Sequence, residues 1–435
     1  MNDAVTVVGA GLAGCEAAWQ LAKRGIPVIL YEMKPVCFSP AHTKPGFAEL
    51  VCSNSLKAEY LSNASGLLKA EMRLLDSLIL KAADEARLPA GGALAVDRDI
   101  FSGCITKALE EHPLVTVRRE RIDEVPSSPA IVATGPLTHE KLSESIRRMP
   151  GFSALHFFDA EAPIVTRDSL DMSRIFAASR YDRGADDYLN CPMTQEEYDA
   201  FYDALVSAET APVHEFDKKQ VFEGCIAVEI LAQRGRQTLC YGPMKPVGLA
   251  DPKTGRMPYA VVQLRRDNMS GTLYNLVGFQ TRLKFGEQKR VFSIIPGLEN
   301  AEFARYGVMH RNTYLNSPDV LGKNYQTKAD PLLRFAGQMT GVEGYMESAA
   351  SGLTAAVSLA NCLEGKPEPE FGNQTLLGAL ASHVCTQTGD FQPMNANFGL
   401  LEPLGKKIRN KKERYELMSA RSLERMADII QTYQL

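Results

Sequence analysis

The first 32 residues carry a strand, a glycine-rich turn, a helix and a second strand, and no other feature constrains the fold as strongly. Residues 4–8 are rich in β-branched side chains, and the pattern G-x-G-x-x-G follows at residues 9–14. Helix-forming residues continue to position 24, and a second apolar run at residues 28–31 ends at Glu32. This order, with an acid at the end of the second strand, predicts the first unit of a dinucleotide-binding sheet.

Each part of this motif has a physical role in holding a pyrophosphate. Gly9 permits the tight turn, Gly11 lets the backbone approach the phosphates, and Gly14 lets the helix pack closely on the strand. The amino end of the helix stabilises the phosphate charge, and the acid can accept a hydrogen bond from the adenosine ribose. The residues expected to bind the dinucleotide here are Gly9, Ala10, Gly11, Gly14 and Glu32.

Two later segments favour FAD over NAD as the dinucleotide. The run Ala-Ile-Val-Ala-Thr-Gly at residues 130–135 is typical of a buried strand that returns beneath the cofactor. Residues 333–345 combine a strand, three glycines and a helix start, as flavoproteins do around the ribityl phosphate and the isoalloxazine; an ordinary strand-loop-helix connection is the alternative. These segments add Thr134, Gly135, Gly337, Gln338, Gly341, Glu343 and Gly344 to the expected cofactor-binding residues.

The middle of the chain lacks the motifs of a disulfide reductase. No second G-x-G-x-x-G occurs there, and none of the nine cysteines forms a C-x-x-C pair. The absence of C-x-x-C pairs also argues against a zinc site, so no metal is expected. Any nicotinamide reductant should therefore bind transiently, at a surface without the fingerprint.

The cofactor motifs are separated by a long middle segment, which indicates two domains. Strand-like runs at residues 155–158, 258–264 and 272–279 predict an inserted α/β domain with an antiparallel sheet over residues 155–300. Residues 1–154 and 301–435 would then form a discontinuous FAD-binding, Rossmann-like α/β domain. A capping box formed by Thr194 and Glu197 predicts a helix at residues 194–209, and residues 409–434 predict a charged amphipathic helix.

Composition narrows the class of protein. No apolar run approaches the roughly 18–20 residues that span a bilayer, and the start of the chain has no signal-peptide pattern, so we expect a cytoplasmic protein without a membrane partner. A net charge of −4 gives no global sign of nucleic-acid binding. Basic residues nevertheless cluster at 282–290 and 406–414, where composition alone favours a solvated helix face.

Two cysteines stand in unusual local settings. Cys52 ends a short apolar run and precedes three small polar residues, which suggests an exposed turn or a helix start. Cys225 follows Gly224, which would let another backbone or a ligand approach. A helix amino terminus or a nearby cation would favour the thiolate at either position. From local sequence alone, a buried structural cysteine is the favoured interpretation of each.

Uncommon strings recur along the whole chain, beyond the glycine fingerprint that many families share. They include PAHTKPGFAELVCSNSLKAE at 40–59, FEGCIAVE at 222–229, RMPYAVVQLRRDN at 256–268, FAGQMTGVEGYMES at 335–348 and FQPMNANFGLLEPL at 391–404. With these strings the chain resembles the folate- and FAD-dependent tRNA (uracil-5-)-methyltransferase family from end to end. The resemblance reverses the interpretation of the two cysteines, because the family implies that both are catalytic. It favours Cys225 as the thiol that attacks uracil and Cys52 as a second catalytic thiol near the flavin, and which of the two attacks uracil stays open.

The resemblance further implies methylation of C5 of the T-loop uridine of tRNA, uridine 54. Methylenetetrahydrofolate would donate the carbon, and FAD reduced by NADH or NADPH would supply the hydride. The basic clusters would contact the phosphates of tRNA, and residues near the flavin would contact folate. The candidates are Arg282, Lys284, Lys289, Arg290, Lys406 and Lys407 for tRNA, and Tyr345, His383 and His42 for folate, with a structural role equally open for the two histidines.

Three alternatives remain open from the sequence. One is the related flavoprotein that modifies wobble uridines of tRNA with a partner GTPase, although that protein carries a longer helical C-terminal extension. Another is a small-molecule flavin oxidoreductase, in which the basic clusters are only solvated surface. The third is a tRNA-binding protein that keeps FAD as a structural relic. The sequence indicates no obligate protein partner.

Overall fold

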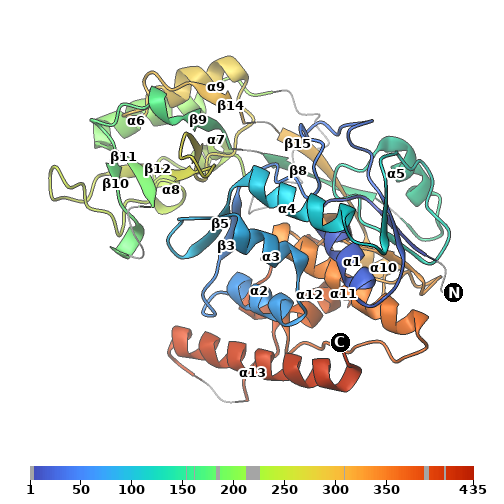
Figure 1. Ribbon diagram of the computed structural model, residues 1–435. Helices are drawn as coiled ribbons and strands as arrows, with labels where there is room; N and C mark the ends of the chain where they lie inside the picture. Colours follow the sequence, from blue (N-terminus) through green and yellow to red (C-terminus); the bar gives the residue numbers. More distant parts are fainter. Residues whose placement is uncertain are drawn as a thin grey trace.

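The computed structural model describes residues 4–152, 154–160, 162–182, 187–211, 226–307, 309–386, 391–405 and 408–435. Its elements gather around two main sheets, one parallel and one antiparallel, in separate parts of the molecule (Figure 1). We call residues 4–152 and 314–435 the parallel-sheet domain and residues 162–307 the inserted domain, each without the undescribed positions.

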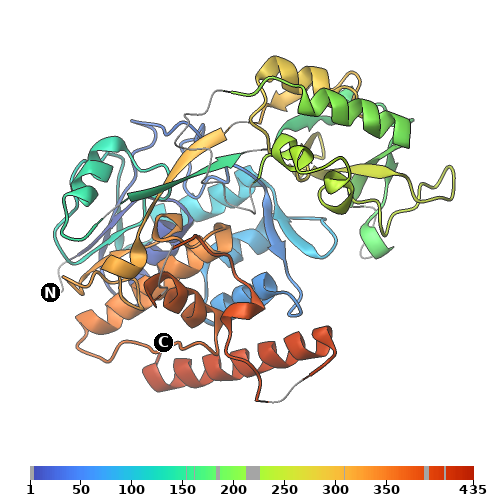
Figure 2. The same ribbon diagram turned by 180° about the vertical axis from the view of Figure 1, so that it is seen from behind.

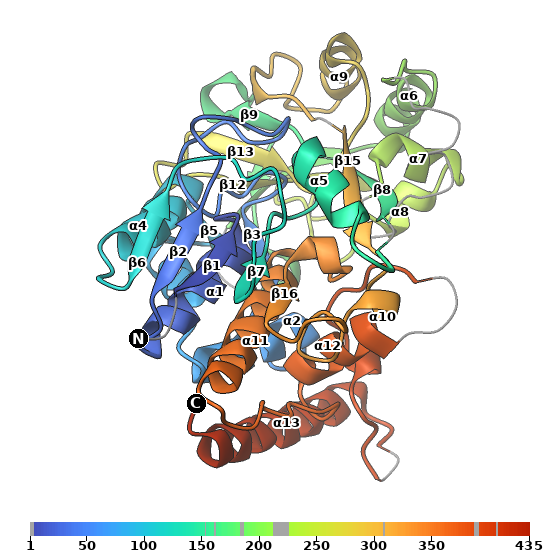
Figure 3. The same ribbon diagram turned by 90° about the vertical axis from the view of Figure 1, so that its right-hand side faces the viewer.

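The parallel sheet has the strand order β16-β7-β1-β2-β6 (Figure 3). In the register, Val8 pairs with both Tyr31 and Val132, so three strands end at the same edge of the sheet. The fold class predicted from the glycine motif is confirmed, since the strands expected near 130 and 333 lie in parallel beside the first. The strands are β1 (Val5–Val8), β2 (Val28–Tyr31), β6 (Val115–Arg118), β7 (Ala130–Val132) and β16 (Leu333–Phe335).

The helices α1 (Leu12–Lys23) and α11 (Tyr345–Leu363) pack directly against one another beside this sheet. A Cβ atom at Gly352 would lie 2.1 Å from the carbonyl oxygen of Ala13, so a larger residue at position 352 would force the helices apart. This contact places the amino end of α1 against the middle of α11.

Further elements complete the parallel-sheet domain. A three-stranded antiparallel sheet has the order β3-β5-β4, and helix α13 runs along the side of the domain away from the inserted domain (Figure 2). These elements are β3 (Ser55–Ala58), β4 (Arg87–Leu88), β5 (Ala93–Val96), α2 (Ala64–Leu74), α3 (Leu78–Glu85), α4 (Arg98–Glu110), α5 (Glu140–Arg147), α10 (Ser317–Val320), α12 (Leu376–Thr386) and α13 (Lys411–Tyr433).

The inserted domain is built on a six-stranded sheet in the order β10-β11-β12-β13-β9-β14, with antiparallel neighbours. The capping box predicted at Thr194 and Glu197 is present at the start of α6, which ends a few residues before the expected position 209. The elements are β9 (Ile164–Thr166), β10 (Phe176–Ala177), β11 (Tyr188–Met193), β12 (Ala260–Arg266), β13 (Leu273–Leu276), β14 (Phe303–Arg305), α6 (Gln195–Val206), α7 (Val228–Gln233), α8 (Thr238–Tyr241) and α9 (Phe285–Phe292).

A two-stranded antiparallel ribbon carries the chain between the two domains. Its strands are β8 (Ala154–Ala160) and β15 (Met309–Leu315), and they pair along their full length. The strand expected at residues 155–158 therefore belongs to this ribbon and not to the antiparallel sheet. Each domain has its own buried apolar cluster. Within the described residues, no helix has the length and apolar character needed to cross a membrane.

Candidate active site

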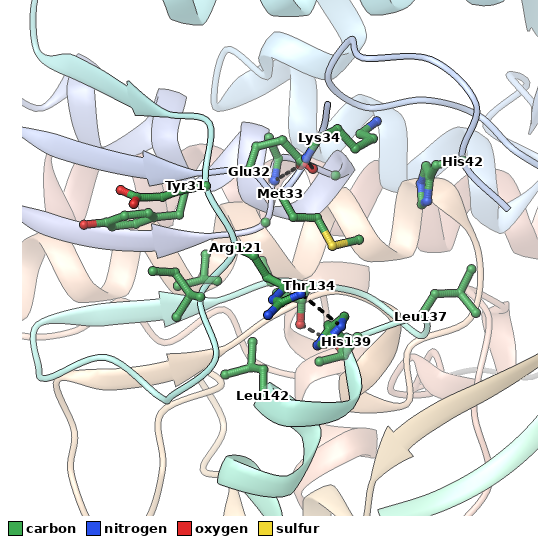
Figure 4. Close-up of a pocket in the computed structure, with 18 of the residues that line it drawn as sticks. Tyr31, Glu32, Met33, Lys34, His42, Arg121, Thr134, Leu137, His139 and Leu142 are labelled. Carbon is green, nitrogen blue, oxygen red and sulfur yellow. Dashed lines mark hydrogen bonds between the residues drawn. The ribbon is translucent and has the colours of Figure 1, made fainter. Parts of the chain in front are cut away.

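A cavity lies at the edge of the parallel sheet where β1, β2 and β7 end (Figure 4). In sheets of this kind, ligands bind outside the carboxyl ends of the strands. Residues that directly follow each of the three strands line the cavity, among them Gly9, Ala10, Gly11, Glu32, Met33, Ala133 and Thr134. The sequence motif and the cavity therefore coincide.

The glycine turn has the geometry that a pyrophosphate requires. Gly9 has a φ of 96°, and a Cβ atom there would lie 2.7 Å from the carbonyl oxygen of Ala133. A Cβ atom at Gly11 would meet no protein atom within 4 Å, so packing against protein does not demand glycine at this position. Gly11 caps α1 without a side-chain hydrogen bond, which leaves the helix amino end open toward a phosphate.

Glu32 is held at the cavity by the backbone on either side of it. Its Oε2 accepts a hydrogen bond from the Ala10 N–H at 2.9 Å, and its Oε1 accepts one from the Lys34 N–H at 2.9 Å. The residue is only 6% exposed. Each carboxylate oxygen has a second lone pair, so the pinned carboxylate can still accept hydrogen bonds from ribose hydroxyls. These residues fit a bound FAD.

Polar residues from later segments form the opposite wall of the cavity. Arg121 and the Nε2 of His139 lie 3.4 Å apart, and the Thr134 and Thr138 hydroxyls are hydrogen bonded at 2.6 Å. His42 stands at one end of the cavity, and its Nδ1 lies 2.5 Å from the Ser39 hydroxyl (Figure 4). The structure thus places His42 in the dinucleotide cavity.

The second cofactor segment follows β16. The Gln338 side-chain amide donates to Glu343 at 2.8 Å, and the Glu343 N–H donates to the carbonyl of Met394 at 2.8 Å. Helix α11 then begins after Gly344, which gives no side-chain cap. His383 on α12 packs near Phe391, and burial lowers the pKa of this histidine.

Gly341 also lies against Phe391, the ring beside His383. A Cβ atom at position 341 would lie 2.4 Å from that ring, so a larger residue would clash there. The remaining expected glycine of the upstream segment, Gly135, follows Thr134 with a φ of 70°. The predicted FAD-binding positions therefore fall in two places, the dinucleotide cavity and the segment between β16 and α11.

Cys52 lies in a bend and contacts the first residue of α11. The Tyr345 hydroxyl is 3.1 Å from the Cys52 Sγ, and it accepts hydrogen bonds from the Cys52 N–H at 2.9 Å and the Ser53 N–H at 3.2 Å. Two expected site residues from distant parts of the sequence are therefore in direct contact. The segment is a bend, and no helix starts there.

Cationic side chains surround this bend. Arg98 donates to the carbonyls of Leu50 and Val51, and it pairs with Asp267 of the inserted domain at 3.1 Å. Burial opposes the charge of Arg98, but Asp267 and then the Tyr345 and Cys52 groups hold its pKa above the ordinary value. Positive charge beside a thiol favours the thiolate, which is the nucleophilic form.

Other predicted residues lie elsewhere or cannot be placed. Cys225, Lys406 and Lys407 fall outside the described residues. In the cluster at 282–290, Lys284 pairs with Glu209 at 2.6 Å and Arg290 with Glu287 at 2.6 Å. Arg282 is mostly buried and lies 3.6 Å from Glu229, whereas Lys289 is exposed. Three of the four cations are thus already near carboxylates.

Sequence reasoning missed the polar residues that hold the Cys52 bend. Arg98, Asn54 and Arg265 were not among the expected site residues, although each contacts residues 50–54 or lies within them. One signal was available in strand β12, where Gln263 and Arg265 alternate with Val262 and Leu264. Polar residues on one face of a buried strand indicate a specific partner.

Comparison with known proteins relates the chain to one family. A family model described as "Glucose inhibited division protein A" matches residues 4–367. The chain is 60% identical over 434 residues to "Methylenetetrahydrofolate--tRNA-(uracil-5-)-methyltransferase TrmFO" of Bacillus licheniformis, covering 99% of this chain and 100% of the relative. It is 56% identical over 433 residues to the protein of the same name from Enterococcus faecalis, with coverage of 99% and 100%.

Solved structures share the fold at lower identity. Aquifex aeolicus GidA in its form I crystal superposes with a TM-score of 0.71 and 16% sequence identity, over 98% of this chain and 76% of that chain. In the form II crystal the TM-score is 0.69 over 99% of this chain and 76% of that chain. At this identity the likeness is one of fold.

Proposed function

The chain belongs to the folate- and FAD-dependent tRNA (uracil-5-)-methyltransferase family, and we propose that it methylates C5 of the T-loop uridine, uridine 54, of tRNA. Methylenetetrahydrofolate supplies the carbon, and NADH or NADPH reduces the flavin. The observation that carries the proposal is the 60% identity to a named relative over the full length of that relative. The dinucleotide cavity and the Cys52–Tyr345 contact supply the local chemistry.

The wobble-uridine alternative has weaker support. The relatives named as uracil-5-methyltransferases are 56–60% identical to this chain and align over 100% of their length. The uracil-5 reaction is therefore the function that we propose.

The chemistry explains why a thiol and a flavin belong together. C5 of uracil becomes nucleophilic only after a thiolate adds to C6, a role that the family resemblance gives to Cys225. C5 would then form a bond to the folate methylene as one of the two bonds from that carbon to folate nitrogens breaks. The second of these bonds would break when tetrahydrofolate leaves. Bound FAD, once reduced, supplies the hydride that turns the transferred carbon into a methyl group. The C5 proton must leave to a base before the thiolate is released.

The residues of this chain divide these tasks. The glycine turn and Glu32 bind the adenosine diphosphate half of FAD, and the start of α11 lies next to Cys52. Tyr345 holds Cys52, and together with His383 it is the proposed folate wall, whereas His42 lies in the cavity beside the adenosine site. The target uridine must leave its stack to reach these groups.

An omission assay tests the proposed reaction. The purified protein, a T-arm RNA, methylenetetrahydrofolate and NADPH are combined, and 5-methyluridine is measured after each component is left out in turn. Carbon-labelled folate should transfer its label to position 54, and an RNA with cytidine at that position should stay unlabelled. Product formation with adenosylmethionine alone would rule out the folate reaction.

Cysteine variants test the assigned thiols. Cys225→Ala and Cys52→Ala should each abolish turnover while the protein stays yellow, and RNA containing 5-fluorouracil should trap a covalent adduct with the attacking thiol. Cys104→Ala is the matched control, because burial and the neighbouring Glu85 raise the pKa of the Cys104 thiol. Turnover near normal in Cys225→Ala would remove its nucleophile role.

A further inference from the structure

The Cys52 bend, residues 50–54, is held from both domains at once. From the parallel-sheet domain, Arg98 binds the carbonyls of residues 50 and 51, and Tyr345 binds the N–H groups of residues 52 and 53. From the inserted domain, Arg305 donates to the carbonyl of Val51. Asn54 is fully buried and donates to the carbonyls of Val96 and Arg266, one in each domain.

Arg265 of β12 contacts two side chains of this bend from the inserted domain. Its Nε donates to the Asn54 Oδ1 at 2.9 Å, and a terminal nitrogen donates to the Ser53 Oγ at 2.8 Å. The residue is 7% exposed. Both hydrogen-bond acceptors are neutral, and within the described residues no carboxylate lies within ion-pairing distance of Arg265.

A buried guanidinium without a carboxylate partner is costly. Burial lowers the pKa of Arg265, and the groups that support its charge are Tyr188, Asp267 and Cys52. Asp267 is already paired with Arg98, and the Tyr188 hydroxyl donates to the carbonyl of Ala90. Of these three groups, the Cys52 thiol is the one that the bend itself carries, and its ionisation would add a counter-charge beside Arg265.

The hydrogen bonds of Tyr345 also favour the thiolate form of Cys52. Its hydroxyl oxygen accepts two N–H bonds, which occupy both lone pairs, so its proton is left to donate to the Cys52 Sγ. A donor aimed at sulfur favours the thiolate over the thiol. Within the described residues, the charged or titratable groups that contact the Cys52 bend include Tyr345 from α11, Arg98 from α4 with its partner Asp267, Arg265 from β12 and Arg305 from β14.

We propose that Arg265 is a positioning residue for Cys52, reaching across from the inserted domain to orient the bend and to stabilise the thiolate. The reactive form of Cys52 is therefore complete only when the two domains are docked through Arg265, Asn54 and Ser53. The inference rests on the proposed function only for the use to which the thiolate is put, because thiol reactivity can be measured without tRNA or folate.

The test is the pH dependence of Cys52 alkylation in the FAD-bound protein. Iodoacetamide labelling is followed by peptide mass spectrometry, and Cys37 in the same molecules is the internal reference, because Cys37 neighbours Arg121 instead of Arg265. Arg265→Gln keeps hydrogen-bonding capacity and removes the charge. It should raise the midpoint pH of Cys52 alkylation by about one unit, the usual effect of losing one nearby opposite charge. The midpoint pH of Cys37 alkylation should stay unchanged.

Two further variants separate charge from structure. Arg265→Lys keeps the charge without the planar fork and should shift the midpoint by less than Arg265→Gln does. Ser53→Ala removes one of the two contacts that aim the guanidinium, and it should give a smaller upward shift; it decides the question if Arg265→Gln fails to fold. An unchanged Cys52 midpoint in Arg265→Gln, or in Ser53→Ala if that variant decides, overturns the proposal. So does an equal shift at Cys37. Normal methylation with a shifted midpoint would refute only the catalytic use of Cys52.

Discussion

The Tyr345 hydroxyl lies 3.1 Å from the Cys52 Sγ, although the two residues are 293 positions apart in the chain. The same hydroxyl accepts the N–H groups of Cys52 and Ser53, so one phenol fixes both the sulfur and the backbone that carries it. Burial raises the pKa of Tyr345, and proximity to Cys52 adds to the effect, so the phenol keeps its proton as a donor to sulfur.

The variant Tyr345→Phe tests this contact. Phenylalanine keeps the ring but leaves two backbone N–H groups without their acceptor and removes the donor to sulfur, a loss of about 1–3 kcal/mol. We expect methylation to fall by about tenfold to a hundredfold, with FAD still bound. Turnover and flavin absorbance measured on the same preparation check this, and turnover within twofold of the unaltered protein would contradict the assigned role.

The variant Gly11→Ala tests the pyrophosphate site. The φ of Gly11 is −76°, which alanine adopts freely, and its Cβ would enter space that no protein atom fills. The variant should therefore fold yet purify without FAD, since the methyl group would occupy the place of a phosphate. Gly103→Ala is the control, because its Cβ also meets no atom. It should retain FAD and stabilise α4 by about 0.5–1 kcal/mol. If Gly11→Ala retained its full flavin content, the pyrophosphate would have to bind at another site.

Local patterns were sufficient to predict the cofactor half of the fold. The glycine motif ending at Glu32, the strand at 130–132 and the strand at 333–335 are each short, apolar and followed by glycine or small residues, and all pair around β1. The capping box at Thr194 depends on two side chains three positions apart, which is why it could be predicted from sequence. These signals lie within single elements.

The rest depends on contacts between distant segments. Nothing local distinguishes β8 from a strand of the inserted sheet, because its partner β15 lies about 150 positions later. Arg265 and Asn54 are 211 positions apart, so the alternation within β12 could mark Arg265 as a polar residue with a partner but could not identify Asn54 as that partner. The roles of the site residues stay predictions, and Cys225 lies outside the described residues.

The variant Lys289→Ala tests whether the face around α9 binds tRNA. Lys289 is exposed and, within the described part of the chain, makes no ion pair, whereas Lys284 pairs with Glu209. Removing one phosphate contact should lower the slope of log affinity against log salt concentration by about one, which filter binding at several salt concentrations measures. Lys284→Ala should change the slope less. Equal slopes in all three proteins would place the tRNA on another surface.

Glu71 is the residue through which pH should act on stability. It is fully buried on α2, and its carboxylate accepts the N–H groups of Leu376 and Leu377 at the start of α12 and the Ser422 hydroxyl of α13. Burial raises its pKa to about 7, against an ordinary value of 4.5, while these three hydrogen bonds act in the opposite direction. One carboxyl group therefore joins three helices of the parallel-sheet domain.

The sign of the pH effect follows from the raised value. The folded protein binds a proton at Glu71 more readily than the unfolded chain, so this contribution to the free energy of unfolding is complete below about pH 4.5 and is lost as the pH rises through 7. The loss is at most about 3 kcal/mol.

The variant Glu71→Gln tests this effect, because glutamine cannot ionise. Urea unfolding is measured at pH 5, 6.5 and 8 with FAD saturating. The free energy of unfolding of the variant should rise relative to that of the unaltered protein as the pH rises. At pH 5 it should be less stable by about 1–2 kcal/mol, because one donor loses its acceptor. Glu424→Gln, at an exposed position of α13, should follow the unaltered protein at every pH. A difference between Glu71→Gln and the unaltered protein that stays constant with pH would mean that Glu71 does not titrate in this range.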